Sequence, residues 1–181
     1  MKTKELIQLM QNEFDSGKSL QAIYEKYKSD NIKEKKLAYM VSSLKDNSLI
    51  QKYKTANNIL IGIMVVITII TVFASYGIGL DVTPDSAIYW TIFSIIPLLF
   101  LYGFIKVNFQ AYLIYIVLSF SQFSNSFKDF GADPMTDIIG LAVSLSIIAF
   151  VWFLKMKLFP YMGFLSPKKN SDKQYLVAVN S

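Results

Sequence analysis

The chain offers few side chains that could do chemistry, and nearly all of them are carboxylates. His and Cys are both absent, which removes the usual proton-transfer residue, the thiolate nucleophile and the common zinc and haem ligands. Five acids lie in two short segments that border apolar stretches: Asp81, Asp85, Asp129, Asp133 and Asp137. They could bind a cation, but acids beside apolar stretches more often stay solvated. We therefore predict a non-enzymatic protein with no catalytic residue, metal or cofactor.

A second set of candidate residues is small and neutral. Gly140 and Ser144 are four residues apart in an apolar stretch, as are Ala142 and Ser146. This spacing lets two helix backbones approach closely. The favoured interpretation is packing inside one helix bundle. The alternative is a contact with another protein or with a second copy of the chain.

A third set is aromatic. Phe120, Phe123, Phe127 and Phe130 recur at spacings of three, four and three, which places them on one stripe of a helix. The favoured interpretation is a helix end lying in a membrane interface with this stripe toward lipid. The alternative is a docking face for another protein.

Four apolar stretches must position these residues. They cover residues 59–80, 87–105, 109–123 and 137–154. The first would form about 33 Å of helix at about 1.5 Å per residue, enough to cross a hydrocarbon core of about 30 Å. The third is the shortest, so a re-entrant segment is an alternative there. Pro97 lies in the middle of the second stretch and predicts a kink.

The sequence therefore predicts an all-α polytopic membrane protein with four transmembrane helices and a small N-terminal helical head. We divide it into a cytoplasmic head (residues 1–57), a transmembrane four-helix bundle (58–157) and a basic tail (158–181). Apolar residues at helical spacing predict about three short helices in the head. The first should end near Gly17, and Ser19 should cap the second.

Charge predicts the orientation in the membrane. All 18 basic residues are Lys; eleven precede the first apolar stretch and five follow the fourth. The first and third links between stretches are net acidic, whereas the short second link contains Lys106. Because lysine excess favours the cytoplasmic side, we expect both termini and Lys106 inside. With no visible cleavable signal peptide, the predicted location is the inner (cytoplasmic) membrane of a bacterium.

Two function classes are disfavoured by residue type. Nucleic-acid binding is not expected, because Arg is absent and the lysines around Glu34 are interleaved with acid. A proton-coupled transporter normally has an ionisable residue inside the membrane, and no apolar stretch has one in its interior.

The C-terminal region resembles the endings of small four-span bacterial inner-membrane proteins of the toxin-immunity type. The resemblance covers about 16 of 181 residues and consists of Lys157-Leu158-Phe159-Pro160, Gly163-Phe164, Pro167-Lys168-Lys169 and Asp172. It implies no active residues. It implies an immunity protein that neutralises a membrane-active toxin by direct binding in or at the membrane.

The best interpretation is thus a membrane interaction protein of this kind. Two alternatives stay open: a small oligomeric channel or carrier, and a membrane-tethered sensor or regulator that acts through its head. The expected partners are the lipid bilayer, a protein toxin or other membrane protein, and a second copy of the chain. If the apolar stretch 137–154 binds the partner, Gly140, Ala142, Ser144 and Ser146 should contact it.

Overall fold

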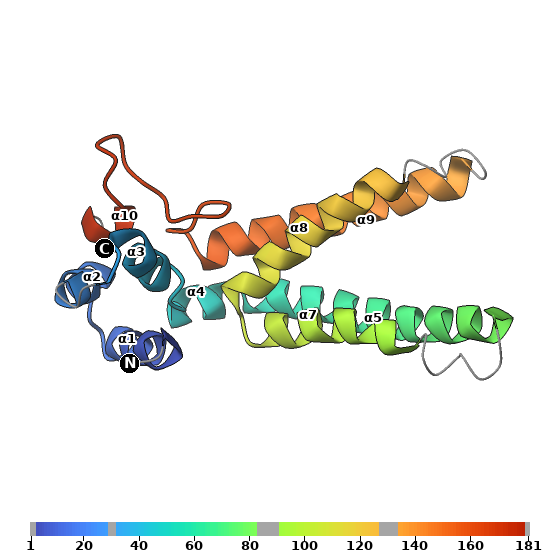
Figure 1. The fold of residues 1–181 in the computed structure, drawn as a ribbon, viewed down its shortest axis with the longest axis horizontal. Coiled ribbons are helices and arrows are strands. Elements are labelled where there is room, and N and C mark those ends of the chain that lie inside the picture. The colour runs from blue at the N-terminus through green and yellow to red at the C-terminus, as the bar shows by residue number, and fades with distance from the viewer. Residues whose placement is uncertain (1–2, 29–31, 83–90, 127–133, 180–181) are drawn as a thin grey trace. The chain divides into compact units, whose positions relative to one another are not determined.

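The computed structural model describes residues 3–28, 32–82, 91–126 and 134–179 (Figure 1). The chain forms two compact units. Unit 1 comprises residues 1–53 and 153–181, and unit 2 comprises residues 54–152. Within the described ranges the regular structure is helical, accompanied by two isolated β-bridges near the C-terminus. The predicted all-α class is confirmed.

Unit 1 begins with short helices whose ends follow local sequence signals. Its elements are α1 (Thr3–Asp15), α2 (Leu20–Lys28), α3 (Glu34–Ser42), α4 (Asn47–Lys52), the last turn of α9, and α10 (Leu176–Val179). Gly17 follows α1 with a positive φ of 94°, a conformation that glycine adopts without a Cβ clash. The Ser19 hydroxyl accepts a hydrogen bond from the Ala22 N–H at 3.1 Å and caps α2. Both predicted boundaries are confirmed.

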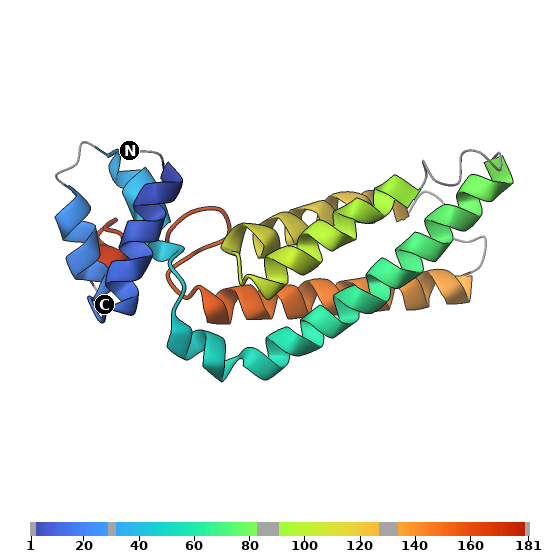
Figure 2. The same ribbon diagram turned by 90° about the horizontal axis from the view of Figure 1, so that it is seen from below.

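The core of unit 1 joins the two ends of the chain. Leu6 and Met10 of α1 pack with α2 and α3, and Tyr175 and Val177 from the C-terminal segment complete the same cluster. Figure 2 shows α10 lying among the N-terminal helices. The sequence divided the head at residue 57 from a tail at residue 158, whereas the structure groups the tail with the head. The reason is that the tail contributes apolar side chains that the head needs to bury.

Unit 2 contains the longer helices. They are α5 (Lys54–Val82), the 3-10 turn η2 (Ile92–Ser94), α7 (Ile95–Ile105), α8 (Phe109–Ser126) and most of α9 (Pro134–Leu158). α7 packs against both α5 and α8 (Figures 1 and 2). The buried positions of α5, which include Leu60, Met64 and Thr68, recur every three or four residues, so one stripe of this helix faces α7.

The prediction of four transmembrane helices is wrong. Over the described residues, two helices are long and apolar enough to cross a membrane, α5 and α9. α7 has 11 residues, about 16 Å at about 1.5 Å per residue, which is well short of a hydrocarbon core of about 30 Å. α8 is also too short over its described apolar part, Phe109–Gln122. Hydropathy depends only on which residues are apolar, so it could not show where α7 begins.

Pro97 lies in the first turn of α7 rather than in the middle of a helix. The first N–H groups of a helix have no partner within that helix, so a residue without an N–H is tolerated there. The helical path changes from 3-10 to α between Ser94 and Ile95. Pro97 therefore marks a helix start, where the sequence predicted a kink.

α7 and α8 form a tight antiparallel hairpin around Lys106 (Figure 1). Val107 in the turn has a φ of 45°, and the Asn108 side chain accepts a hydrogen bond from the Gln110 N–H at 2.9 Å. A Cβ placed on Gly103 would lie 2.3 Å from the Ala111 Cβ. Glycine at this position therefore permits the close approach of the two helices.

Candidate functional site

The small-residue face of α9 is open. Gly140, Ala142, Ser144 and Ser146 are all exposed, and a Cβ added to Gly140 would meet nothing within 4 Å. Only 17% of the most apolar 18-residue part of α9 is buried. This face is therefore exposed among the described residues, and whether it packs inside one bundle or contacts a partner stays a prediction.

The phenylalanine stripe lies only partly within the described residues. Phe120 is 52% exposed near the end of α8. Phe123 belongs to the same helix, and Phe127 and Phe130 fall outside the described residues. The structure therefore places one side chain of this set and leaves the interpretation of the stripe a prediction.

Sequence reasoning missed a buried polar cluster at one end of unit 2. The Asn57 side chain donates a hydrogen bond to the Phe104 carbonyl at 3.2 Å and accepts one from the Tyr112 hydroxyl at 2.5 Å. Asn57 is 7% exposed and Tyr112 is fully buried. The cluster ties the first turn of α5 to the end of α7 and the start of α8. Asn57 was assigned to the edge of the head, so its role as an anchor of the hairpin had no sequence signal.

The described charges of unit 2 lie at opposite ends of α5. Lys54 begins α5, and Lys106 directly follows the last residue of α7. Both therefore lie at the end of unit 2 that contains Asn57. Asp81 lies in the last turn of α5, at the opposite end of that helix.

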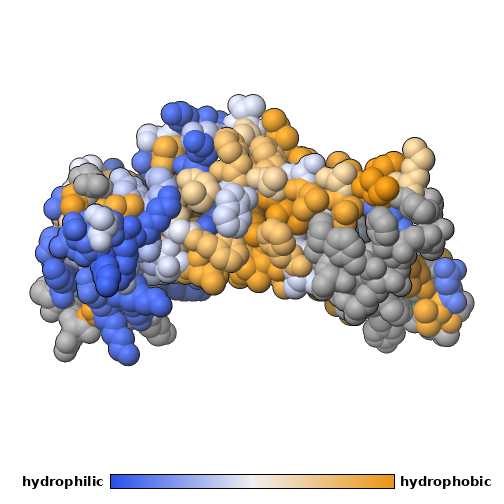
Figure 3. Space-filling view, turned by 90° about the horizontal axis from the view of Figure 1, so that it is seen from above, coloured by the Kyte–Doolittle hydropathy of each residue, from blue (hydrophilic) through white to orange (hydrophobic). Residues whose placement is uncertain are grey.

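Figure 3 shows hydrophobic surface over the helices of unit 2 and hydrophilic surface over unit 1. Large apolar side chains of unit 2 are open, with Phe73 at 73% and Leu99 at 65% exposure.

Charge separates the two units. Unit 1 contains 15 of the 18 lysines and eight of the 13 acids, a net charge of +7, whereas unit 2 has a net charge of −2. The best-connected acid of unit 1 is Glu13, which binds Lys18 at 3.1 Å, Lys26, and the Tyr27 hydroxyl at 3.1 Å. The bond from Lys26 is the main reason that the pKa of Glu13 falls to about 2. This cluster links α1 to α2, so we interpret its role as structural.

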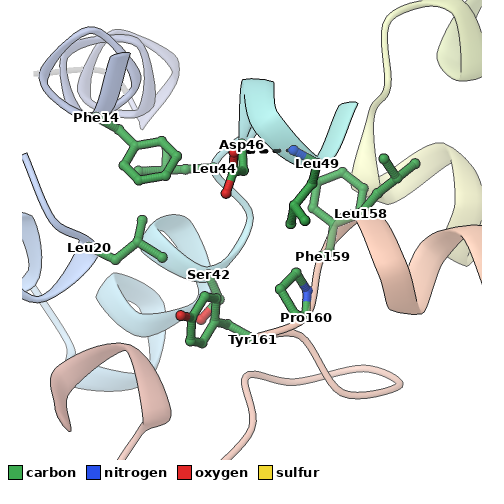
Figure 4. Close-up of a pocket in the computed structure, with 10 residues that line it drawn as sticks. All are labelled: Phe14, Leu20, Ser42, Leu44, Asp46, Leu49, Leu158, Phe159, Pro160 and Tyr161. Carbon is green, nitrogen blue, oxygen red and sulfur yellow. Dashed lines mark hydrogen bonds between the residues drawn. The ribbon is translucent and has the colours of Figure 1, made fainter. Parts of the chain in front are cut away.

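A small hollow lies within unit 1, beside the chain that follows α9 (Figure 4). The buried Ser42 hydroxyl on its wall has no hydrogen-bond partner among the described residues. The Asp46 carboxylate is used locally, because it caps α4 by accepting the N–H of Ser48 at 2.7 Å. A volume of about 20 Å³ holds about one water molecule, so the hollow is too small for a metabolite. Its lining residues are Phe14, Leu20, Ser42, Leu44, Asp46, Leu49, Leu158, Phe159, Pro160 and Tyr161.

Lys155 is a second residue whose buried position the sequence did not predict. It is completely buried near the end of α9. Its ammonium group donates hydrogen bonds to the carbonyl of Gly163 and, at 3.3 Å, to that of Phe164. A lysine that follows an apolar helix normally extends into water or headgroups, so its burial could not be read from the sequence. The signal that was available is the pair of turn residues, Pro160 and Gly163, shortly after it.

The described side chains include no group of three or more acidic, His or Cys residues that could hold a metal ion. The predicted acidic cluster is described only at Asp81 and Asp137, since the other three aspartates lie outside the described residues. No protein-family model matches the chain, and neither a curated protein nor a solved structure matches it. The function must therefore be argued from this chain alone.

Proposed function

We propose that the protein is a non-enzymatic membrane protein that acts by binding another protein along the open face of α9. The observation that carries this proposal is that face itself. α9 is long and apolar enough to cross a membrane, and its small residues between Gly140 and Ser146 are exposed. Small residues let a second helix approach closely inside a bilayer.

The membrane placement rests on apolar exposure and on charge. Side chains such as Phe73 and Leu99 are mostly open in unit 2, and apolar surface of this extent is unfavourable in water. In the proposed placement α5 and α9 cross the inner membrane of a bacterium and the α7–α8 hairpin lies against α5. Unit 1, with its net charge of +7, is on the cytoplasmic side.

The specific form of the proposal is an immunity protein, whose partner is the membrane-active segment of a toxin. A helical toxin segment would meet α9 at Gly140 and Ser144 and would be held there instead of assembling a pore. This form rests on the resemblance of the C-terminal motifs. It predicts protection against one toxin and none against that toxin's relatives.

Site-specific photocrosslinking tests the binding face. The chain has no Cys, so a benzophenone maleimide can be attached at Ser144→Cys on α9 or, as the matched control, at Ala74→Cys on the exposed surface of α5. We expect illumination of native membranes to link a foreign protein from position 144 and none from position 74. Adding Gly140→Leu should remove that product, because the larger side chain blocks close approach.

Three outcomes would count against the proposal. Identical products from both positions would mean that the face of α9 only contacts lipid. A product that contains only a second copy of the chain would favour the oligomeric channel or carrier. A product that persists unchanged with Gly140→Leu would place the contact elsewhere on α9.

A further inference from the structure

The chain after α9 forms a small hairpin with an apolar tip. The Lys168 N–H donates to the Tyr161 carbonyl at 2.9 Å, and the Gly163 N–H donates to the Ser166 carbonyl at 2.8 Å. Met162 pairs with Pro167 at the base. We call residues 163–166 the tip. All of these residues belong to unit 1.

The base of this hairpin is fixed, whereas the tip is open. Met162 is fully buried and Pro167 is buried with it. Phe164 and Leu165 in the tip are 41% and 62% exposed. Two adjacent large apolar side chains are therefore exposed at the turn of a hairpin whose base is buried.

Lys155 braces the tip from inside. Its ammonium group binds the carbonyls of Gly163 and Phe164 and lies 5.7 Å from the centre of the Phe164 ring, within cation–π range. A Cβ on Gly163 would lie 2.9 Å from the Ser166 carbonyl oxygen, so the turn also requires glycine. A buried lysine is costly unless its hydrogen bonds are made, and here they hold the apolar tip in one conformation.

We propose that the tip inserts into the headgroup region of an anionic lipid bilayer, close to the cytoplasmic end of α9. This inference rests on the proposed crossing of the membrane by α9. Phe164 follows the last residue of α9, Leu158, by six residues, so it lies within about 20 Å of that helix end at about 3.3–3.6 Å per residue. Aromatic and aliphatic side chains of this kind are favourable at the interface.

The charges around the tip fit lipid of negative charge. Lys157 is exposed in the last turn of α9, and Lys168 and Lys169 follow the hairpin. Lysines close to a cytoplasmic leaflet gain about 1 kcal/mol each from acidic lipid. The lysines attract the surface, and the tip then adds the burial of two apolar side chains.

Spin-label depth measurements on the full chain in vesicles test this inference. A nitroxide is attached at Leu165→Cys in the tip, at Ser171→Cys as an exposed control in the same segment, and at Val66→Cys in α5. The vesicles contain phosphatidylcholine with phosphatidylglycerol. Collision with oxygen reports lipid, and collision with a neutral nickel chelate reports water. We expect a several-fold higher oxygen-to-nickel ratio at position 165 than at 171, and a higher one still at 66.

Two further samples test the brace and the charge. Lys155→Met removes the hydrogen bonds to the tip and should lower the ratio at position 165. Vesicles of pure phosphatidylcholine should lower it as well, because the lysines lose their attraction; an unchanged ratio there would overturn the role of lipid charge.

The remaining outcomes are distinct. Water exposure at position 165 while position 66 lies in lipid would overturn insertion of the tip but not the membrane placement of α5. Shielding of position 165 from both reagents would mean that a protein covers the tip, which also overturns the inference. Water exposure at position 66 would overturn the proposed membrane placement and this inference with it.

Discussion

Single side chains determine how the helices of unit 2 are held. Asn57 satisfies a backbone carbonyl of α7 and a hydroxyl of α8 with one amide group. Both partners are removed from water, because Phe104 and Tyr112 are fully buried. Buried hydrogen bonds are costly to remove, so Asn57 contributes to holding the hairpin against α5.

We expect Asn57→Ala to destabilise the protein by about 1–3 kcal/mol, because two buried hydrogen bonds, to the Phe104 carbonyl and from the Tyr112 hydroxyl, would be lost. The chain supplies its own control, since Asn58 is next in sequence and exposed. Asn58→Ala should change the stability by less than about 0.5 kcal/mol. Unfolding in mixed micelles followed by circular dichroism measures both variants, and equal losses would show that the cluster does not anchor the hairpin.

Residues with local partners were the ones that the sequence predicted well. Gly17 and Ser19 act on a backbone within a few residues, so their roles follow from residue type and spacing. Lys155 and Asn57 act through partners that the chain brings near only when folded. In the candidate binding face, spacing identified Gly140 and Ser144 as a small-residue pair. It could not tell whether a neighbouring helix of the same chain covers them.

At the scale of elements, hydropathy predicted apolar helices and misjudged their length. The stretch 87–105 has enough apolar letters for a crossing, but α7 occupies only Ile95–Ile105 after the 3-10 turn. The end of the chain shows the same limit. Tyr175 and Val177 complete the core of unit 1 from a segment that the sequence assigned to a separate basic tail. Periodicity in the head predicts which face of each helix is buried, but it does not show that residues near the end of the chain cover that face.

The shared core makes a prediction about α10. Val177 is 1% exposed and Val179 is 41% exposed, so the two valines form a matched pair. Val177→Asp would place an unpaired charge among Tyr24, Leu37 and their neighbours and should destabilise unit 1 by about 2 kcal/mol or more. Val179→Asp should stay within about 0.5 kcal/mol of the original protein.

Limited tryptic digestion of the intact protein in mild detergent measures the effect at a distance. With Val177→Asp we expect faster cleavage at the lysines of residues 1–53, although the substitution lies at the opposite end of the sequence. With Val179→Asp the pattern should match the original protein. Faster cleavage confined to residues 159–181 would contradict a common core.

At the scale of the whole molecule, the distribution of charge and the number of long apolar helices both support the proposed orientation in the membrane. Unit 1 contains both termini and has a net charge of +7, whereas unit 2 has a net charge of −2. Two crossings by α5 and α9, as proposed above, would return the chain to the side on which it began, as four would have done. Two candidate helices in place of four therefore leave the expected side of both termini unchanged.

A labelling experiment tests this orientation directly, because any cysteine introduced into the chain is the only one. Asp81→Cys near the end of α5 and Met135→Cys near the start of α9 should react with a membrane-impermeant maleimide in intact bacterial cells. Lys4→Cys and Asp172→Cys should react only after the cells are made permeable. All four positions are exposed, so a difference in labelling reports the side of the membrane rather than burial. Termini that label on opposite sides would require an odd number of crossings, and termini that both label in intact cells would reverse the orientation that the lysines predict.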